Sequence, residues 1–449
     1  MFKKVLIANR GEIASRIIRT CKRLNIDTVA IYSDPDKDSL YVQEATECYP
    51  LGGTRVHESY LNIDKVLQIA KEAEVDAIHP GYGLLSENGD FAERCAERGF
   101  VFIGPKPSIM RKMGNKIEAR RTMEEAGVPI VPGTDAATND LEEAIQEAKR
   151  IGYPIMLKAA SGGGGIGMQL VQNEAELMKA FDGNSKRATM FFGDGTMFLE
   201  KFIEEPRHIE IQLLADEHGN AVYLFERECS IQRRHQKVVE EAPSPFLSEE
   251  TRTKMGEVAV RAALQLGYSN AGTIEFLVDA HEHFYFLEMN TRLQVEHPVT
   301  EEITGVDLVE EQIRVASGEP LRFRQKDLTI EGHAIEVRIY AEDPYTFYPA
   351  PGQLTDLQLP QGDGIRHELS IHRTSTISPF YDPMIAKYVV SGDSRDAVIR
   401  RIEETLPTYK VEGIKTNIPM IYDVISHPQF KAGRTTTNFV ELYYQNQPN

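Results

Sequence analysis

One stretch decides how the rest of this chain is interpreted: Phe284-Tyr-Phe-Leu-Glu-Met-Asn-Thr-Arg-Leu-Gln-Val-Glu-His-Pro298. Its first half alternates strictly, and successive side chains of a β-strand point to opposite faces. The alternation predicts one face with Phe284, Phe286, Glu288 and Asn290, and an opposite face with Tyr285, Leu287 and Met289.

A second strand is predicted just upstream, at residues 273–279, and completes a hairpin. With a turn at residues 280–283, Glu275 lies directly across from Glu288, and Asn290 lies diagonal to the pair. Two facing carboxylates repel each other and destabilise a strand pair. A divalent cation between them reverses that effect, and carboxylate and amide oxygens are ligands that suit magnesium. The sequence therefore predicts a magnesium site on this hairpin.

The second half of the stretch carries Arg292, Gln294 and Glu296 on one side, until Pro298 ends the alternation. A guanidinium, an amide and a carboxylate beside a metal pair form a site for a small oxyanion with a base next to it. An ordinary surface hairpin is the alternative, because charged strand faces are common. Carboxylates at matched positions, followed by Arg-x-Gln-x-Glu, favour the functional site.

Composition places the chain among soluble globular proteins of several domains. Its 449 residues are enough for about three domains of ordinary size. Hydrophobic residues make up 41% and charged residues 26%, which excludes a disordered or fibrous protein. The formal net charge of −18 argues against nucleic-acid binding, which requires a basic surface. Any phosphate site must therefore be a local concentration of Lys, Arg and backbone N–H groups.

The sequence shows no pattern typical of export or of membrane insertion. The four cysteines have neither C-x-x-C spacing nor zinc-like pairing with histidine, as expected of free thiols in a reducing compartment. The apolar run at residues 4–8 is too short for a signal peptide, and no stretch approaches the length of a membrane span. We therefore expect a cytoplasmic protein without membrane contact.

Residues 1–114 predict an open, mostly parallel α/β domain. Helical periodicity alternates there with short apolar strands at residues 4–8, 28–32, 76–79 and 100–103. A dinucleotide-binding fold is a weak alternative, because no G-x-G-x-x-G follows the first strand. Pro80-Gly-Tyr-Gly83 follows the third strand, at the strand end where open sheets bind ligands, although a purely structural turn is an almost equal alternative.

Residues 115–330 predict a second domain with a glycine-rich insertion at about residues 131–203. The strand Tyr153–Lys158 is followed by Ala159-Ala-Ser-Gly-Gly-Gly-Gly-Ile-Gly167 and by another strand at residues 168–171. A flexible linker is one interpretation of four consecutive glycines. A loop held between two strands favours a phosphate-covering lid, to which Lys158 adds a point charge.

Other elements of this domain are predicted from their periodicity. Helices are expected at residues 112–126, 249–266 and 307–317, and antiparallel strands at 207–214 and 221–226. Met197–Ile203 places Glu200 and Lys201 at an edge suited to reading an adenine.

Cationic residues are densest between Cys229 and Val238, at Arg233, Arg234, His235 and Lys237. A solvated charge patch is the usual explanation of such a run, but its place beside the acidic hairpin favours an anion site.

Residues 331–449 predict a third domain of mixed α+β structure. His333–Tyr340 is expected to be a strand with Glu336 and Arg338 on one face. Segments at residues 354–359, 365–369 and 384–390 suggest a small mixed sheet crossed by a helix at 395–406.

Taken together, the glycine lid, the lysine before it, the paired carboxylates and the oxyanion pocket resemble the ATP-grasp ligases. Along essentially its whole length, the chain resembles the biotin carboxylases more narrowly. The segments that carry this resemblance are Ile7-Ala-Asn-Arg-Gly-Glu-Ile13, His79-Pro-Gly-Tyr-Gly83, Phe102-Ile-Gly-Pro105, Ser230-Ile-Gln-Arg-Arg-His-Gln-Lys237 and Glu288-Met-Asn-Thr-Arg-Leu-Gln-Val-Glu-His-Pro298. The resemblance implies an N-terminal pre-ATP-grasp α/β domain, a central ATP-grasp fold and a C-terminal mixed α+β domain.

The resemblance also implies a set of residues that bind ATP and its metal ions. The implied ATP contacts are Lys116, Lys158, Gly163, Gly164, Gly165, Glu200, Lys201, Ile203, His208, Gln232, His235 and Leu277, together with Glu275 and Glu288. A pair of Mg²⁺ or Mn²⁺ ions that bridge the phosphates would be held by Glu275 and Glu288, with Asn290 close by.

The implied chemistry has two steps. Bicarbonate would be bound by Lys237, Arg292, Gln294 and the Val295 backbone, with Glu296 as its base. The bicarbonate oxygen would attack the γ-phosphorus to give carboxyphosphate. Phosphate left after release of CO₂ would deprotonate biotin, while Arg338 stabilises the enolate and Tyr82 and Gly83 border the ring. A closed lid would keep water from carboxyphosphate.

The chain departs from the family in its lid, and the biotin itself must come from elsewhere. Ile166 and Gln169 stand where many members carry Arg, which leaves open how the closed lid is held. No Lys flanked by Met occurs, so biotin would arrive on a separate biotin carboxyl carrier protein, with a carboxyltransferase as a further partner.

The resemblance also implies a homodimer, with Arg19 and Arg366 near its interface. The expected process is the first half-reaction of an acetyl-CoA or other acyl-CoA carboxylase, with a pyruvate or urea carboxylase as the alternative.

Two other functions remain open from the sequence. An ATP-grasp ligase that activates another carboxylate for an amine would keep the fold and change the acceptor. A nucleotide-binding regulatory protein would have no turnover. The intact set Glu275, Glu288, Arg292 and Glu296 argues against the latter, because a decayed site has no physical reason to retain paired carboxylates.

Overall fold

The N-terminal part folds around a parallel sheet, as its alternating strand and helix patterns predict. The computed structural model describes residues 1–134, 136–160 and 168–445. The sheet has the strand order β3-β2-β1-β4-β5, and all its neighbours are parallel. Its strands are β1 (Lys4–Ile7), β2 (Asp27–Tyr32), β3 (Glu47–Pro50), β4 (Ala77–His79) and β5 (Val101–Phe102). The helices of this part are α1 (Gly11–Arg23), α2 (Leu40–Glu44), α3 (Ile63–Glu72), α4 (Gly89–Glu97) and α5 (Pro107–Gly114).

The single helix predicted at residues 112–126 is wrong, because the chain forms two helices there. The first, α5, ends at Gly114, and α6 runs from Lys116 to Glu125. Asn115 lies between them in an extended conformation, and its side chain accepts hydrogen bonds from the N–H groups of Ile117 and Glu118, both at 3.1 Å. An Asn side chain that caps a new helix in this way competes with continuation of the old one.

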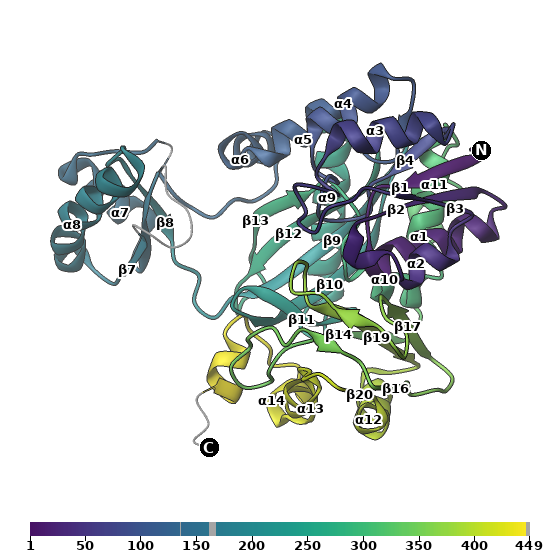
Figure 1. Cartoon of the computed structure of the whole chain (residues 1–449). Helices are drawn as coiled ribbons and strands as arrows, with labels where there is room; N and C mark the ends of the chain where they lie inside the picture. Colours follow the sequence, from purple (N-terminus) through teal and green to yellow (C-terminus); the bar gives the residue numbers. More distant parts are fainter. Residues whose placement is uncertain (135, 161–167, 446–449) are drawn as a thin grey trace.

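Residues 141–201 form a unit with a core of its own, which stands apart from the rest of the molecule in Figure 1. Its antiparallel sheet has the order β7-β6-β8, so the two strands predicted beside the glycine loop do pair with each other. Leu157, Phe181 and Leu199 are among the residues of its core. The elements are α7 (Leu141–Ile151), β6 (Ile155–Ala159), β7 (Met168–Val171), α8 (Glu174–Phe192) and β8 (Met197–Lys201).

An antiparallel sheet of eight strands forms the centre of the molecule, in the order β13-β12-β9-β10-β11-β14-β19-β17. Its strands are β9 (Arg207–Ala215), β10 (Ala221–Arg233), β11 (Gln236–Ala242), β12 (Asn270–Val278), β13 (Phe284–Asn290), β14 (His333–Tyr340), β17 (Ile365–Leu369) and β19 (Met384–Gly392). The small mixed sheet suggested for residues 354–359, 365–369 and 384–390 is therefore wrong, because only the last two segments pair, and they do so as antiparallel strands of this central sheet. β14 pairs with β11 along one edge and with β19 along the other, which joins the C-terminal strands to the central sheet. The predicted divisions at residues 114 and 330 stay predictions.

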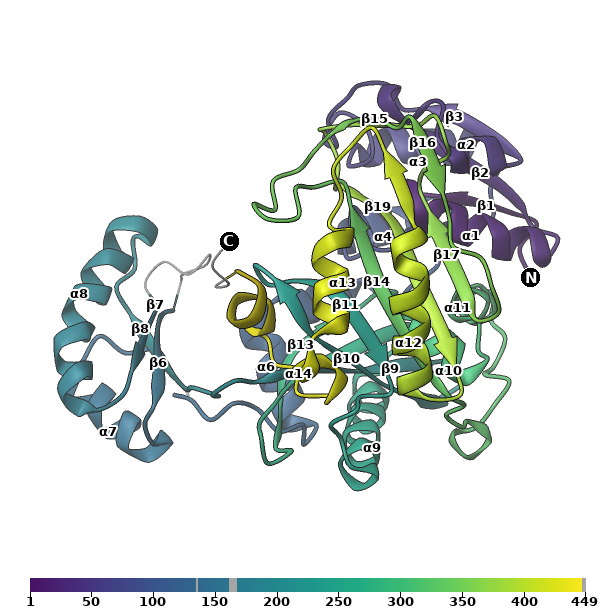
Figure 2. The same ribbon diagram turned by 90° about the horizontal axis from the view of Figure 1, so that it is seen from below.

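The helices that follow cover both faces of this sheet. They are α9 (Glu249–Leu266), α10 (His297–Thr304), α11 (Leu308–Ala316), α12 (Arg395–Thr405), α13 (Ile418–Ser426) and α14 (Pro428–Lys431). Figure 2 shows α12 and α13 across β14 and β19, where Val337 and Ile339 belong to the shared core. The opposite face of β14 packs under α10. Glu336 and Arg338 alternate with Val337 and Ile339, so they face α10.

Short elements complete the chain. They are the strand pairs β15 (Gly352–Gln353) with β18 (Thr376–Ile377) and β16 (Asp356–Gln358) with β20 (Lys410–Glu412), and the single turns η1 (Asp34–Asp36), η2 (Gln325–Asp327), η3 (Leu406–Thr408) and η4 (Glu441–Gln445). None of the helices in the described ranges combines the length and the apolar character needed to cross a lipid bilayer.

Packing of α9 on the central sheet generates a prediction about Gly256. A Cβ at this position would lie 2.4 Å from Cε2 of Tyr223 on β10. Helix propensity alone favours Ala over Gly by about 1 kcal/mol, but overpacking of a tight contact costs about 1–3 kcal/mol. We expect Gly256→Ala to lower the free energy of unfolding, measured by urea denaturation. Gly183→Ala on α8 is the control, because nothing lies within 4 Å of its Cβ, and we expect it to be neutral or stabilising. A Gly256→Ala protein as stable as Gly183→Ala would contradict this account.

Candidate active site

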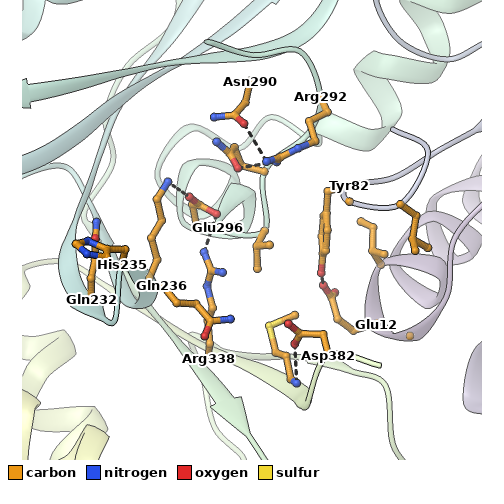
Figure 3. A pocket seen from close by; sticks show the side chains of 18 of the residues that line it. Glu12, Tyr82, Gln232, His235, Gln236, Asn290, Arg292, Glu296, Arg338 and Asp382 are labelled. Carbon is orange, nitrogen blue, oxygen red and sulfur yellow. Dashed lines mark hydrogen bonds and ion pairs between the residues drawn. The ribbon is translucent and has the colours of Figure 1, made fainter. Parts of the chain in front are cut away.

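A cavity of about 780 Å³ lies where the N-terminal parallel sheet meets the central antiparallel sheet (Figure 3). The loop after β4 contributes Tyr82 and Gly83, as expected for a loop at the carboxyl end of a parallel strand. Hairpin β10–β11 contributes Lys237, and β14 contributes Arg338. The cavity therefore collects side chains from all three predicted parts of the chain.

Hairpin β12–β13 confirms the predicted pairing, but not the predicted alternation. Glu275 lies directly opposite Glu288, and Thr273 lies opposite Asn290. Phe276 pairs with Phe286, so Leu287 is one extra residue on β13 and forms a β-bulge. Because the bulge reverses the facing of side chains, Phe286 and Met289 share the hydrophobic core, whereas Leu287, Glu288 and Asn290 all line the cavity. The two faces predicted for this strand are wrong for that reason.

Glu275 is buried, and both its oxygens have polar partners. Its Oε1 lies 2.9 Å from Lys237 Nζ, 2.9 Å from Asn290 Nδ2 and 2.7 Å from Gln294 Nε2, and its Oε2 lies 2.6 Å from His208 Nε2. Burial opposes ionisation, but the charge of Lys237 and the contact with His208 hold the pKa of Glu275 well below its usual value. Glu275 is therefore an anion that the surrounding donors keep in one orientation.

Glu288 is exposed, and only Asn290 Nδ2, at 3.5 Å, contacts its carboxylate among the described residues. Glu275, whose oxygens already have several polar partners, thus lies opposite Glu288, whose carboxylate is open to solvent. The Asn290 amide lies beside them. Oxygen donors of this kind fit Mg²⁺, which binds through one or two carboxylates and keeps several of its waters. The residues present therefore fit the predicted metal group, with Glu288 as the more accessible ligand.

The ammonium of Lys237 lies among three carboxylates. Its Nζ is 2.6 Å from Glu210 Oε2, 2.6 Å from Glu296 Oε1 and 2.9 Å from Glu275 Oε1. Burial disfavours the charged form, but these carboxylates outweigh that effect and raise the pKa of Lys237 well above its usual value. Lys237 is therefore a permanent cation at the centre of the site.

Sequence reasoning missed Glu210 and its partner Arg227, whose Nε lies 2.5 Å from Glu210 Oε1. Both side chains are completely buried. A signal was present in β9, where His208, Glu210 and Gln212 alternate and so share one face. Three polar residues on one face of a strand inside a domain indicate a polar site on that face.

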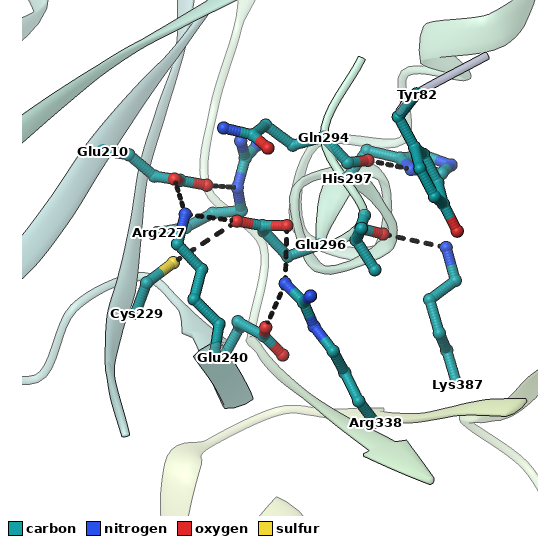
Figure 4. Close-up of polar contacts among 12 residues, drawn as sticks. Tyr82, Glu210, Arg227, Cys229, Glu240, Gln294, Glu296, His297, Arg338 and Lys387 are labelled. Atoms are coloured by element: carbon teal, nitrogen blue, oxygen red, sulfur yellow. Dashed lines mark hydrogen bonds and ion pairs between the residues drawn. The ribbon is translucent and has the colours of Figure 1, made fainter. Parts of the chain in front are cut away.

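Glu296 stands at the end of the loop that leads into α10, and it links two cations (Figure 4). Its Oε1 contacts Lys237, and its Oε2 lies 2.9 Å from Arg338 Nη2. The same Nη2 lies 2.6 Å from Glu240 Oε1. Burial opposes ionisation of Glu296, but Lys237, Arg338 and Arg227 hold its pKa well below the usual value. Glu296 is therefore ionised at neutral pH.

Residues 291–296 form a loop and not the continued strand that alternation predicted. The three predicted polar residues nevertheless share the cavity, because Arg292, Gln294 and Glu296 all line it while Leu293 is buried in the core. Val295 also lines the cavity. Pro298 lies in the first turn of α10, where a proline fits because it lacks an N–H to satisfy.

Arg292 is oriented by three side-chain acceptors. It donates from Nη1 to Gln294 Oε1 at 2.7 Å, from Nη2 to Asn290 Oδ1 at 2.9 Å and from Nε to Glu87 Oε2 at 2.9 Å. Glu87 also accepts from the Thr291 N–H at 2.9 Å, so it holds both the side chain and the backbone of the loop. Sequence reasoning missed Glu87, although it lies four residues after the Pro80–Gly83 loop that was singled out.

The predicted ATP contacts fall into two groups. His208, Gln232, His235 and Leu277 line the cavity together with Glu275 and Glu288. Within the described part of the chain, the others lie away from it, namely Lys116, Lys158, Glu200, Lys201 and Ile203. Gly163, Gly164, Gly165 and Ile166 lie outside the described residues.

Three residues of the second group have polar partners away from the cavity. Lys158 forms an ion pair with Glu200, which also contacts Arg120 Nη1 at 3.2 Å. Lys201 Nζ donates to the carbonyls of Gly152 and Tyr153, at 3.0 Å and 2.8 Å. Gln169 accepts from Asn184 Nδ2 at 2.8 Å, so in this arrangement it is tied to α8.

The cationic run contributes to the cavity only in part. Arg233 is paired with Glu342 at 2.5 Å, and Arg234 is exposed near the Thr346 carbonyl at 3.3 Å. His235 and Lys237 line the cavity. The prediction that the whole run forms an anion site is therefore wrong for its two arginines, because Glu342 neutralises the first and the second lies on the outside of the turn.

Comparisons with known proteins agree with this geometry. Family models match residues 1–110 (Biotin carboxylase, N-terminal domain), 115–324 (Carbamoyl-phosphate synthase L chain, ATP binding domain) and 336–442 (Biotin carboxylase C-terminal domain). Biotin carboxylase 2 of Bacillus subtilis is 62% identical over 443 residues, which cover 99% of this chain and 100% of the relative. Biotin carboxylase of Haemophilus influenzae is 50% identical over 442 residues, covering 98% of this chain and 98% of the relative.

The fold agrees as well. The biotin carboxylase domain of Hydrogenobacter thermophilus 2-oxoglutarate carboxylase superimposes with a TM-score of 0.89 and 47% identity, covering 98% of each chain. The chain therefore belongs to the biotin carboxylase family, and it is an ATP-grasp ligase that carboxylates biotin.

Proposed function

We propose that the cavity carboxylates biotin presented by a separate carrier protein, and that Glu296 is the base that starts the reaction. The observation that carries this proposal is the position of the Glu296 carboxylate. It is ionised, buried and held between Lys237 and Arg338, in the same cavity as Arg292 and the facing acids of hairpin β12–β13. A base, an anion-binding guanidinium and a metal-binding pair thus surround one space.

In the first step, bicarbonate binds against Arg292, Gln294, the Val295 backbone and Lys237. Glu296 takes its proton, and the bicarbonate oxygen then forms a bond to the γ-phosphorus of ATP as the bond from that phosphorus to ADP breaks. The products are carboxyphosphate and ADP. Fixed donors and cations that face the transferring group lower the barrier because they need no reorganisation during the reaction.

Glu275, Glu288 and Asn290 would hold Mg²⁺ or Mn²⁺, which supplies charge neutralisation for the phosphates when bound. The Hydrogenobacter thermophilus structure is described as a complex with MgADP, ADP and bicarbonate, which supports this assignment.

In the second step, carboxyphosphate separates into CO₂ and phosphate, and the phosphate removes the proton from the ureido nitrogen of biotin. That nitrogen then forms its bond to CO₂. Arg338 stabilises the negative charge on the ureido oxygen, and Tyr82 and Gly83 border the bicyclic ring. Arg338 suits this role because its guanidinium already lies at the cavity beside Glu296.

The unit of residues 141–201 completes the ATP site by moving toward the cavity. Lys158, Glu200 and Lys201 lie on β6 and β8 of this unit, away from the cavity in the present arrangement. Closure brings these three residues over the nucleotide and excludes water from carboxyphosphate. Its separate core allows the unit to move as one body.

The partners follow from the chemistry. The carboxylated biotin leaves on its carrier protein to a carboxyltransferase, which selects acetyl-CoA, another acyl-CoA or a different acceptor such as pyruvate. We also propose a homodimer whose interface includes Arg19 and Arg366, which lie together because both pair with Glu368. Purification of the biotinylated partner on streptavidin, followed by mass spectrometry of what accompanies it, identifies the acceptor system.

ATP hydrolysis by the purified protein should require bicarbonate and should increase when free biotin is added. Hydrolysis should require bicarbonate because bicarbonate is the nucleophile that attacks ATP. It should increase with biotin because biotin consumes the products of carboxyphosphate. The measurement is ADP release in rigorously carbonate-free buffer, with bicarbonate and then biotin restored. Equal hydrolysis with and without bicarbonate would favour a ligase that activates a different carboxylate.

Replacing Glu296 tests its role as the base. We expect Glu296→Ala and the isosteric Glu296→Gln to reduce bicarbonate-dependent kcat by about 10²–10⁴-fold. Binding of ATP, measured by calorimetry, should be nearly unchanged, because Glu296 faces bicarbonate. Glu311→Gln is the matched control, since Glu311 is also buried and paired with Arg322 but lies outside the cavity. Loss of ATP affinity in both Glu296 variants would contradict the assignment.

Metal binding should depend on Glu288 without a cost to folding, because this exposed carboxylate has no cationic partner among the described residues. In the presence of a non-hydrolysable ATP analogue, we expect Glu288→Gln to weaken Mn²⁺ binding by about tenfold or more, measured by electron paramagnetic resonance. Glu282→Gln, in the turn of the same hairpin, should bind Mn²⁺ like the wild type. Equal Mn²⁺ affinity in the two variants would remove Glu288 from the metal site.

A further inference from the structure

The segment Asn9-Arg-Gly-Glu12 carries part of the family resemblance, but the proposed mechanism uses none of its residues. It connects β1 to α1, and all four residues line the cavity. Asn9 and Glu12 are each only 3% exposed, which is unusual for polar side chains without a structural or functional task. Their contacts lead to two residues that the mechanism does use.

Asn9 holds the backbone of the loop that carries Tyr82. Its Nδ2 donates to the carbonyl oxygens of Pro80 and Tyr82, both at 2.7 Å. Its Oδ1 accepts from the N–H of Arg10 at 2.8 Å, so the amide cannot rotate without loss of a contact. One buried side chain therefore determines where the loop after β4 enters the cavity.

Glu12 holds the other end of Tyr82 and connects it to Lys387. Its Oε1 accepts a hydrogen bond from the Tyr82 hydroxyl, and Figure 3 shows the two side chains end to end. The same oxygen lies 3.2 Å from Lys387 Nζ, on β19, and Lys387 is completely buried. Lys387 Nζ donates in turn to the carbonyl oxygen of Val295 at 2.8 Å (Figure 4).

These contacts form one continuous chain from Tyr82 through Glu12 and Lys387 to the Val295 carbonyl. It joins the residue proposed to border biotin to the peptide proposed to contact bicarbonate. The ion pair is not arranged for maximal stability, because Glu12 Oε2 is buried and has no hydrogen-bond partner within the described residues. Burial raises the pKa of Glu12, and Lys387 opposes that effect. An ion pair that only stabilised the fold would be expected to satisfy both oxygens.

We infer that Asn9, Glu12 and Lys387 are positioning residues. Asn9 fixes the Tyr82 loop at the biotin subsite, and the ion pair of Glu12 and Lys387 holds Tyr82 and the Val295 carbonyl in a fixed relation. The inference rests on the proposed function, which assigns those subsites. Asn9 acts on the Tyr82 loop alone, whereas Lys387 acts on both ends of the chain of contacts. The two residues therefore affect different sets of Michaelis constants.

The experiment compares KM for free biotin with KM for bicarbonate in a set of variants. We expect Asn9→Ala to raise KM for biotin by about fivefold or more and to leave KM for bicarbonate unchanged. Lys387→Met should raise both constants, because it removes the donor to Val295 and the cation beside Glu12. In Asn9→Ala, hydrogen exchange of the amides at residues 80–84 should also become faster, and this readout does not require turnover.

A double variant separates positioning from stability. Lys387→Met removes the cation beside Glu12 and its charge from nearby buried Glu336 and Glu368, so the melting temperature should fall, and a poorly folded protein is one expected result. Adding Glu12→Gln removes one of these buried charges and should raise the melting temperature above that of Lys387→Met. KM for bicarbonate should remain raised in the double variant, because the donor to the Val295 carbonyl is still absent. Recovery of both the melting temperature and KM for bicarbonate would overturn the inference.

Glu241→Gln is the matched control. Glu241 is 2% exposed and pairs with His333 and Arg395, but it does not line the cavity. It should leave both Michaelis constants unchanged. Equal effects of Asn9→Ala on the two constants, or unchanged exchange at residues 80–84, would also overturn the inference. Failure of the proposed function would give a different result from failure of this inference. ATP hydrolysis by the wild type would then depend on neither bicarbonate nor biotin.

Discussion

The geometry of the site depends on one ammonium group shared by three carboxylates. Charges removed from water are costly unless opposite charges and hydrogen bonds compensate them. Lys237 contacts Glu210, Glu275 and Glu296, which come from β9, β12 and the loop before α10. If any of these segments moved away, a buried carboxylate would lose one of its two basic partners. The contacts of Lys237 therefore hold three separate segments at a fixed spacing around the cavity.

Each of these carboxylates has a second basic partner. Glu210 contacts Arg227, Glu296 contacts Arg338, and Glu275 contacts His208. Lys237 can thus turn toward an incoming anion while each of the three carboxylates keeps a basic neighbour. The proposed mechanism needs a site whose charges are balanced before substrates bind. It also needs a cation that bicarbonate can contact once it has bound. The second set of basic partners allows Lys237 to meet both needs.

The sequence predicted those parts of the site that depend on local pattern. Alternation and turn length placed Glu275 opposite Glu288, and periodicity gave α9 and β14 their observed bounds. The bulge at Leu287 was missed because one inserted residue leaves the apolar pattern plausible in either register. Glu87 was missed because its partner Arg292 is 205 positions away, and no local pattern reports such a contact. The separate C-terminal sheet was predicted wrongly because sequence does not show which edges of β14 are paired.

That sheet topology also explains which part of the molecule is free to move. Glu275, Glu210, Lys237 and Arg338 lie on β12, β9, β11 and β14, which belong to one continuous sheet. Adjacent strands are held about 4.8 Å apart by backbone hydrogen bonds, so the backbones that carry Lys237 and Arg338 cannot separate without breaking the ladder between β11 and β14. The unit of residues 141–201 has its own sheet and core, and its described residues share no strand ladder with the central sheet. In the mechanism proposed above, movement therefore belongs to the unit of residues 141–201, while Lys237 and Arg338 stay in place on the central sheet.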